Sequence, residues 1–303
     1  MPVRRTCPVA PMTESLSFIE RRWTSRDGLD LYARDYPATG MERGLPVVCL
    51  HGLTRNSRDF EELAPLIARL GRRVIAADVR GRGQSAHDPD PRHYHPRVYA
   101  RDVADMLDGL GIDRAVFIGT SMGALITMAL TAVRTRAIAG AVLNDAGPEV
   151  SPDGIARILG YAGKGHPVRD WAGAVEYARR TNGTAFPDLS DADWAKVARR
   201  MFRDASGGPT LDYDPAIAAV IGKPPSRLAG WIARMLFKRL ARRAPLLLIR
   251  GSNSDIITAD IAARMRKMAP AMQQVDVPGV GHAPMLDEPV AVDAITRFLR
   301  TVP

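Results

Sequence analysis

The chain reads Ala115-Val-Phe-Ile-Gly-Thr-Ser-Met-Gly123 at the point that decides its fold. The first four residues form an apolar run, and an apolar helical pattern begins directly after Ser121. The two glycines that flank this serine suit a sharp turn from a strand into a helix, because a side chain at either position would collide with the neighbouring backbone. The amide groups at the start of that helix favour negative charge beside the serine. The stretch therefore predicts a nucleophilic Ser121 at the end of a buried strand.

Similar apolar runs lie on both sides of this stretch, and helical patterns separate them. We expect strands at residues 47–50, 74–79, 115–119, 138–143, 246–249 and, more weakly, 273–277, and helices at residues 57–70, 97–110, 122–133, 259–268 and 289–299. Continuous apolar runs suit strands that are buried on both faces of a parallel sheet. Two alternating segments, 16–24 and 29–35, are joined by a turn that ends in Asp27-Gly28 and predict a hairpin. Together these patterns indicate an open α/β sheet that begins with a hairpin.

The pattern changes between residues 143 and 246, where helical periodicity continues without a buried-strand run. We expect one helix that is capped at residues 190–193 and runs through Phe202, and another at residues 226–241. The chain then divides into a first core part (1–147, with a loose tail at 1–13), an all-helical cap (148–243) and a second core part (244–303). The spacing leaves two roles open for the insert, a lid over a site or a packing layer.

Composition sets the class of the protein. The 303 residues are 46% hydrophobic and 25% charged, which suits one large globular domain with an insert. No apolar run reaches the roughly 18 residues of a membrane-spanning helix. The two cysteines, Cys7 and Cys49, indicate neither a disulfide framework nor a thiolate metal site, which fits a reducing cytoplasm. The first residues carry charge without a following apolar stretch, so we expect no secretory signal.

The net charge of +9 raises the question of nucleic-acid binding. Five of the 42 basic residues are lysines, and the 37 arginines are scattered along the chain. Only 6% of the residues are aromatic, so neither a basic groove nor a base-stacking surface is supported, and we expect no nucleic-acid partner. The basic helix at residues 226–243 could lie on a membrane surface, but cap packing is favoured and no stable membrane association is expected. We expect a monomer or a homodimer.

A serine nucleophile requires a base and an orienting carboxylate. His282 lies in the loop Pro278-Gly-Val-Gly-His-Ala-Pro284, which follows the last expected strand and can reach the carboxyl edge of the sheet. Asp255 and Asp145 each follow an expected strand. We favour Asp255 as the carboxylate, because it gives the chain order Ser…Asp…His at the usual spacing, and we expect Asp145 to cap or hinge the insert.

The oxyanion of a tetrahedral intermediate requires amide donors. The segment His51-Gly52-Leu53 follows an expected strand, so we predict that the amides of Leu53 and Met122 form the oxyanion hole, and that His51 is structural. We expect Leu53, Met122 and Met285 to contact the substrate.

For the sequence pair His93-x-His95, the sequence identifies no third metal ligand, so we predict no metal site.

These motifs resemble those of the α/β-hydrolase superfamily from about residue 28 to 300. The matching segments are His51-Gly52, Asp78-Val-Arg-Gly-Arg-Gly-Gln-Ser85, Gly119–Gly123, Gly251–Asp255 and Gly281-His282. The resemblance implies a mostly parallel eight-stranded sheet with a cap inserted after its sixth strand. It also implies Ser121 as the nucleophile, His282 as the base and Asp255 as the acid, with no metal and no organic cofactor.

The resemblance also limits the classes of reaction that this chain is expected to catalyse. Superfamily dehalogenases and epoxide hydrolases carry aspartate where this chain has Ser121, and many carbon–carbon-bond hydrolases have tryptophan where Ala283 follows the histidine. The three-glycine oxyanion motif of lipases is absent, since Leu53 and Thr54 follow Gly52. We therefore expect a hydrolase of a carboxylic ester or lactone of a small hydrophobic or aromatic substrate.

The sequence leaves two groups of alternatives open. The first is hydrolysis of a carbon–carbon bond in ring-cleavage products, or an enol-lactonase of aromatic catabolism. The second is a non-hydrolytic ligand-binding member or a cofactor-free oxygenase of the same fold. Nine aromatic residues between residues 148 and 245 favour an apolar pocket roof, although each one alone is better explained as core: Tyr161, Trp171, Tyr177, Phe186, Trp194, Phe202, Tyr213, Trp231 and Phe237.

Overall fold

The computed structural model of the protein describes residues 17–165, 168–221 and 226–303. The predicted loose tail at residues 1–13, Cys7 and His166 lie outside the described residues.

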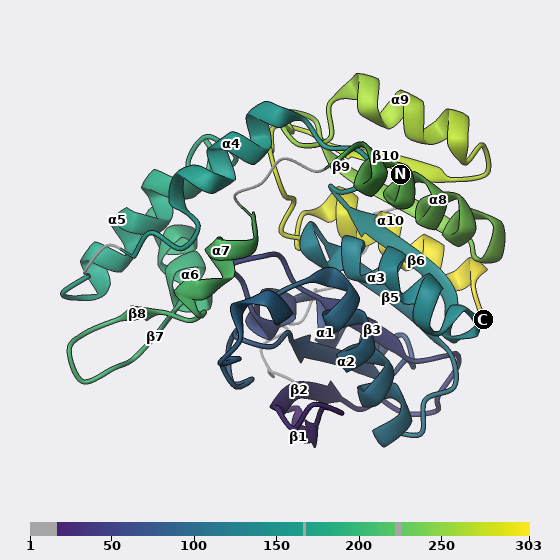
Figure 1. The fold of residues 1–303 in the computed structure, drawn as a ribbon, viewed down its shortest axis with the longest axis horizontal. Helices are drawn as coiled ribbons and strands as arrows, with labels where there is room; N and C mark the ends of the chain where they lie inside the picture. The colour runs from purple at the N-terminus through teal and green to yellow at the C-terminus, as the bar shows by residue number, and fades with distance from the viewer. Residues whose placement is uncertain (1–16, 166–167, 222–225) are drawn as a thin grey trace, which may run out of the picture.

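A single eight-stranded sheet forms the centre of the described chain (Figure 1). Its order is β1-β2-β4-β3-β5-β6-β9-β10, and all strands after the antiparallel pair β1 and β2 run parallel to one another. The strands are β1 (Ile19–Thr24), β2 (Asp30–Tyr36), β3 (Val47–Leu50), β4 (Val74–Asp78), β5 (Ala115–Thr120), β6 (Ile138–Asn144), β9 (Leu246–Gly251) and β10 (Gln273–Val277). The predicted mostly parallel eight-stranded sheet, with a hairpin at its start, is therefore confirmed.

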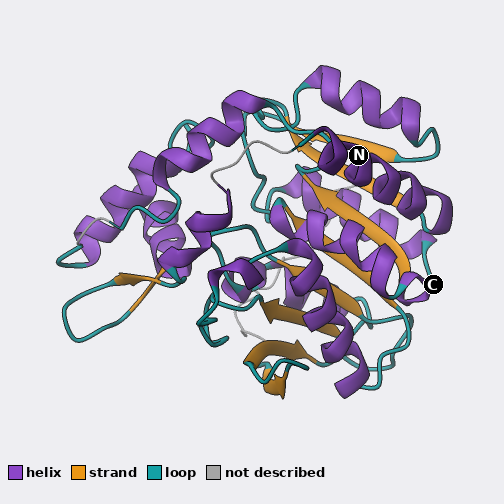
Figure 2. Cartoon of the chain, viewed as in Figure 1, coloured by secondary structure: helices purple, strands orange, loops and turns teal. Residues whose placement is uncertain are grey.

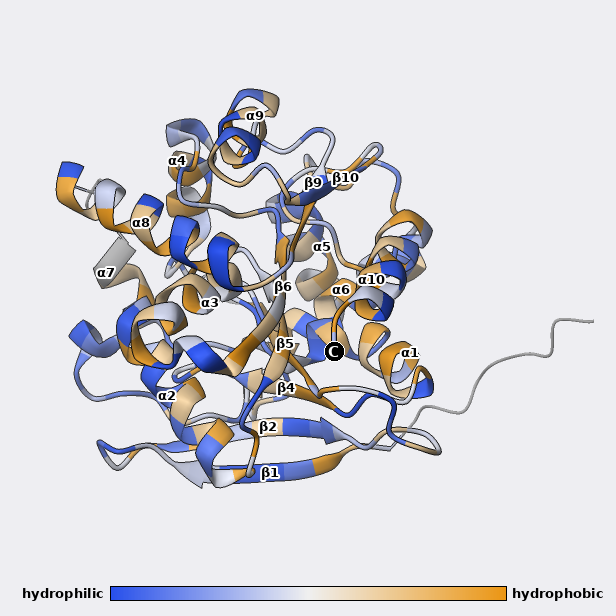
Figure 3. Cartoon of the chain, turned by 90° about the vertical axis from the view of Figure 1, so that its right-hand side faces the viewer, coloured by the Kyte–Doolittle hydropathy of each residue, from blue (hydrophilic) through white to orange (hydrophobic). Residues whose placement is uncertain are grey.

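Helices cover both faces of the sheet, as Figure 2 shows. One face packs against α2 (Pro96–Gly109), α3 (Met122–Val133), α8 (Arg227–Arg243) and α9 (Ala259–Met268), and the other packs against α1 (Leu63–Arg69) and α10 (Pro289–Thr301). Successive residues of β3 alternate between the two cores: Val48 and Leu50 face one, and Val47 and Cys49 face the other. Burial on both faces explains why these strands read as unbroken apolar runs, which Figure 3 shows between the helices.

The chain between β6 and β9 extends away from one end of the sheet (Figure 1). It contains α4 (Pro152–Tyr161), α5 (Trp171–Asn182), α6 (Asp191–Met201) and α7 (Ala218–Ile221), followed by α8. Ser190 caps α6 through a reciprocal pair of hydrogen bonds with Asp193, as expected. The prediction that this segment is all helical is wrong, because the short strands β7 (Phe202–Arg203) and β8 (Thr210–Leu211) pair antiparallel within it. Runs of two residues are too short to give a strand pattern in the sequence.

The sheet order explains where a site can form. Strands β3, β5, β6 and β9 are neighbours and run parallel, so the loops that follow them leave the same edge of the sheet. None of the described helices combines the length and apolar character needed to cross a bilayer.

Candidate active site

Ser121 occupies a tight turn between β5 and α3. Its backbone has φ 51° and ψ −110°, a strained conformation for a residue with a side chain. The flanking glycines are required by close packing: a Cβ on Gly119 would lie 2.4 Å from the carbonyl carbon of Gly123, and a Cβ on Gly123 would lie 2.0 Å from the Leu50 oxygen. The turn therefore holds the Ser121 hydroxyl at the carboxyl edge of the sheet, with α3 starting at the next residue.

His282 brings its imidazole to this hydroxyl, from the loop between β10 and α10. Its Nε2 lies 2.9 Å from Ser121 Oγ. The Gly281 amide donates a hydrogen bond to the Ala185 carbonyl (2.7 Å), so the insert helps to hold the loop. The loop that carries His282 also packs closely against the end of β9, since a Cβ on Gly251 would lie 2.4 Å from the Gly281 oxygen. The structure thus brings together the predicted serine and histidine from positions 161 residues apart.

Asp145, and not Asp255, meets the other nitrogen of this imidazole, which corrects the sequence prediction. Asp145 Oδ2 lies 2.8 Å from His282 Nδ1, and the residue is fully buried at the end of β6. Ser254 Oγ donates a hydrogen bond to the same oxygen (2.6 Å), and the Gly251 amide donates to the other (3.3 Å). The reason lies in the sheet: the Ser121 amide donates to the Asn144 carbonyl (2.9 Å), so the end of β6 is tied directly to the serine turn.

Asp255 instead pairs with the insert. Its carboxylate accepts two hydrogen bonds from Arg157 of α4, at 2.5 and 2.8 Å, and 38% of its side-chain surface is exposed. The Arg157 guanidinium holds the pKa of this carboxyl below its ordinary value. Asp255 therefore fastens α4 to the loop after β9, one strand beyond the loop that carries Asp145.

Leu53 and Met122, the predicted oxyanion donors, lie near Ser121, but their side chains have different environments. Gly52 lies against the serine, since a Cβ added to it would be 3.9 Å from Ser121 Cβ. Leu53 lines the cavity beside Ser121, but Met122 does not, because its side chain turns into the core below α3. The expected contact of Met122 with the substrate stays a prediction. No hydrogen bond from either amide is found within the described residues.

His51 has a structural position, as expected. The Val79 amide donates to its Nε2 (3.0 Å), and its Nδ1 therefore donates to the Gly52 carbonyl (2.7 Å). Burial lowers the pKa of this imidazole to about 4, so it is neutral at physiological pH. His51 thus ties the loop after β3 to the end of β4.

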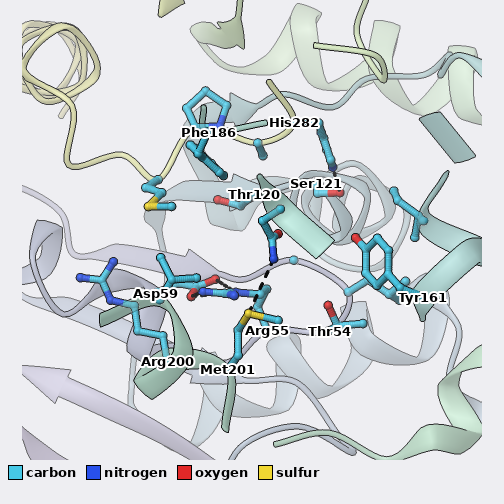
Figure 4. A pocket seen from close by; sticks show the side chains of 18 of the residues that line it. Thr54, Arg55, Asp59, Thr120, Ser121, Tyr161, Phe186, Arg200, Met201 and His282 are labelled. Carbon is cyan, nitrogen blue, oxygen red and sulfur yellow. Dashed lines mark hydrogen bonds and ion pairs between the residues drawn. The ribbon is translucent and has the colours of Figure 1, made fainter. Parts of the chain in front are cut away.

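A small cavity opens in front of Ser121 and His282 (Figure 4). Its volume is about 100 Å³, below the roughly 300–1,000 Å³ of sites for drug-sized ligands. Met285 lines it, as predicted. Of the nine aromatic residues expected as a roof, Tyr161 and Phe186 reach this lining, while Trp231 is 60% exposed on α8. The other lining side chains are both polar and apolar: Thr54, Arg55, Asp59, Phe60, Thr120, Ile158, Asn182, Val197, Arg200, Met201, Ala283 and Pro284.

One group of described side chains comes close enough to share a metal ion, namely Asp27, Asp88 and His93. The Arg80 guanidinium donates hydrogen bonds to both carboxylates, at 2.8 and 2.5 Å. A buried arginine thus already forms ion pairs with both carboxylates, and we interpret the group as part of a structural ion-pair network. His95, the partner of His93 in the sequence motif, caps α2 instead by accepting from the Arg97 amide (3.2 Å).

Sequence reasoning missed two residues that organise the site. Ser254 orients Asp145, and Asn144 donates from its side-chain amide to the Pro284 carbonyl (2.8 Å), which anchors the histidine loop to β6. Asn144 directly follows the apolar run at residues 138–143, and Ser254 lies in the polar loop that comes after the run at 246–249. Nothing in the sequence indicates which partner each one meets across the sheet edge.

Comparisons with known proteins give the relatives of the chain and of its fold. A family model described as "alpha/beta hydrolase fold" matches residues 46–289. The chain is 30% identical over 257 residues to a 3-hydroxybutyrate-oligomer hydrolase of Cupriavidus necator, covering 83% of this chain and 87% of the relative. It is 27% identical to a 2-(acetamidomethylene)succinate hydrolase of Mesorhizobium japonicum, covering 82% and 86%. A crystal structure of an alpha/beta hydrolase from Novosphingobium aromaticivorans has a TM-score of 0.85 and 43% identity, covering 94% of this chain and 98% of that one.

Proposed function

Because the chain belongs to the α/β-hydrolase family, we propose that it hydrolyses carboxylic esters of small acids, with lactones as a related substrate class. The observation that carries this proposal is the unbroken hydrogen-bond chain from Ser121 Oγ through His282 to Asp145. Serine is a weak nucleophile unless an adjacent base takes its proton. In this proposal the imidazole of His282 acts as that base, and the buried carboxylate of Asp145 orients it and stabilises the imidazolium.

In the proposed reaction, Ser121 Oγ attacks the acyl carbon while His282 Nε2 accepts its proton. The tetrahedral intermediate collapses when the carbon–oxygen bond to the alcohol breaks, and His282 returns the proton to the departing oxygen. A water molecule then attacks the acyl-enzyme, and the same imidazole takes a proton from the water and passes it to Ser121. The carboxylic acid is released and the serine is restored.

The oxyanion of each tetrahedral intermediate would be received by the amide groups of Leu53 and Met122. The Met122 amide lies at the N-terminus of α3, where the helix dipole favours negative charge. Preorganised donors of this kind typically contribute about 3–4 kcal/mol each to the transition state.

The cavity favours a small acyl group. Its size is limited and its lining combines apolar side chains with Arg55, Asp59 and Arg200, so an acyl group with a polar substituent fits it better than a large aromatic one. The Cupriavidus necator relative is named for oligomers of 3-hydroxybutyrate, a short hydroxy acid joined through ester bonds. We also propose that the segment between β6 and β9 acts as a cap, since Ile158, Phe186 and Met201 from it line the cavity.

The experiment that tests this function uses Ser121→Ala. With p-nitrophenyl acetate and butyrate, kcat should fall by at least about 10⁴-fold, because the nucleophile is lost, while the thermal midpoint stays within a few degrees. Ser252→Ala removes a hydroxyl that lies outside the cavity and should leave kcat unchanged. Wild-type protein should also be labelled by a fluorophosphonate on the peptide that contains Ser121.

Two results would contradict the proposal. Wild-type activity in Ser121→Ala would show that another group performs the reaction. Failure of wild-type protein to be labelled would favour a binding member of the fold or a cofactor-free oxygenase. A panel of lactones and a ring-cleavage dienoate, assayed beside the esters, separates carbon–oxygen from carbon–carbon cleavage.

A further inference from the structure

Arg82 is a completely buried arginine that has no carboxylate partner among the described residues. Removing a cation from water is unfavourable unless an opposite charge or strong hydrogen bonds compensate it. A buried guanidinium without an anion is therefore unusual, and its surroundings indicate what it does.

The hydrogen bonds of Arg82 reach both residues that are proposed to donate to the oxyanion. Its Nε donates to the Leu53 carbonyl at 2.9 Å, and its Nη2 lies 3.6 Å from the sulfur of Met122. Its Nη1 donates to the Arg80 carbonyl (2.8 Å) and to the Tyr99 hydroxyl (2.9 Å). The rings of Tyr94 and Tyr99 lie within 5.4 Å of the guanidinium carbon, which adds a favourable cation–π contribution. All of these partners are uncharged, so the positive charge is not cancelled.

Arg80 provides an internal contrast, because it lies two residues earlier and is equally buried. Its guanidinium donates hydrogen bonds to Asp27, Asp88 and Asp102, and these bonds include the pair with Asp102 at 2.6 and 2.7 Å. Arg80 thus serves an ion-pair network, whereas Arg82 makes no such pair.

The backbone around Arg82 also connects the core to the insert. Arg82 forms an isolated antiparallel bridge with Tyr213. The Gly83 amide donates to the Asp212 carbonyl (3.0 Å), and the Asp214 amide donates to the Gly81 carbonyl (2.8 Å). The guanidinium therefore contacts the loop after β3 and the first residue of α3 from a point that the insert holds in place.

We propose that Arg82 is the positioning residue of the oxyanion hole, an inference that rests on the proposed ester hydrolysis at Ser121. Its guanidinium holds the carbonyl of Leu53 and the side chain of Met122, and so restricts these two residues such that their amide groups stay directed at the space beside Ser121. Its uncancelled positive charge favours the negative charge that develops there. Arg82 acts through Leu53 and Met122, and it does not contact the substrate.

The test compares Arg82→Met, which keeps length and apolar volume, with Arg82→Lys, which keeps the charge. Activity is expressed per active site, counted after complete labelling of each protein with a p-nitrophenyl phosphonate. We expect Arg82→Met to lower kcat about 10- to 100-fold, with KM changed less than about threefold, since misdirected oxyanion donors affect the transition state alone. Arg82→Lys should recover part of this loss.

The affinity for a tetrahedral mimic separates positioning from a general structural role. A methyl trifluoromethyl ketone binds as an oxyanion, so its inhibition constant should rise by the factor by which kcat/KM falls, while that of the carboxylate product stays constant. Arg80→Lys is the matched control: we expect it to lower the thermal midpoint and to leave the ratio of the two inhibition constants unchanged. If Arg82→Met fails to fold, the ratio of the inhibition constants of the ketone and the carboxylate product is measured for Arg82→Lys and Arg82→Gln instead.

Three outcomes would overturn the inference: an unchanged kcat per labelled site, a fall in kcat with unchanged ketone affinity, or an equal loss of ketone affinity in Arg80→Lys. Wild-type protein that is not labelled at Ser121 would instead overturn the proposed function. The two failures are therefore distinguishable.

Discussion

The loops after β6 and β9 leave the same edge of the sheet, and each carries an aspartate, yet the two carboxylates have different environments. Asp145 is fully buried, has φ 53° and receives hydrogen bonds from Ser254 and Gly251 beside the imidazole of His282. Asp255 is partly exposed and forms an ion pair with Arg157 of α4. The same residue type thus orients a candidate base in one loop and fastens the insert to the core in the other.

Both aspartates lie between Ser121 and His282 in the chain, so chain order does not distinguish them, whereas their positions in the sheet do. β6 lies next to β5, whose end carries Ser121, whereas β9 lies one strand further away. The end of β9 and the loop after it still contribute, because Gly251 and Ser254 direct their donors at Asp145. One loop therefore supplies the charge, and the other supplies the hydrogen bonds that hold it in place.

The largest expected effect comes from removing the carboxylate charge of Asp145, and removing that of Asp255 provides the comparison. Asp145→Asn should lower kcat for p-nitrophenyl butyrate by about 10⁴-fold, because the amide no longer selects the tautomer or stabilises the imidazolium. Asp255→Asn is the matched variant and should change kcat less than about threefold. If Asp255→Asn were the more damaging of the two, the assignment of the carboxylates would be reversed.

An intermediate effect is expected from the hydroxyl that links the two loops. Ser254→Ala removes the 2.6 Å hydrogen bond to Asp145 Oδ2, so kcat should fall about tenfold with little change in KM. Ser252→Ala removes a neighbouring hydroxyl that accepts from the Gly279 amide and should leave kcat near the wild-type value. Equal losses in the two variants would indicate a general loosening of the loop and not the orientation of Asp145.

The smallest effect concerns pH and the ion pair of Asp255. Arg157 holds the Asp255 pKa below its ordinary value, so below about pH 4 the unfolded chain takes up the proton more readily than the folded protein. The stabilisation is therefore present above about pH 4 and is lost as pH falls, and a partly exposed pair contributes no more than about 1 kcal/mol.

Urea unfolding of wild type and Asp255→Asn at a series of pH values measures this contribution. The difference in their free energies of unfolding should be constant at neutral pH and should shrink below about pH 4. A difference that increases on acidification would contradict the ion pair.

Much of the fold could be predicted from the sequence, because each buried parallel strand leaves an unbroken apolar run. The run at residues 47–50 coincides with β3, and the helices expected at 122–133 and 259–268 coincide with α3 and α9. The pair β7 and β8 was missed, since two-residue strands have no periodicity. The aromatic residues of the insert were expected at the pocket, but most pack elsewhere, because composition does not reveal which side of a helix faces the cavity.

The sequence alone determined the serine turn, since the close approaches at Gly119 and Gly123 permit no other residue type, and it indicated which histidine could reach that turn. Only the tertiary structure decided which aspartate meets His282 and which arginine contacts Leu53 in the loop after β3. The physical reason is that the steric limits on a tight turn depend on residues that are adjacent in the sequence. The partner of a charged side chain depends instead on which strands lie side by side in the sheet.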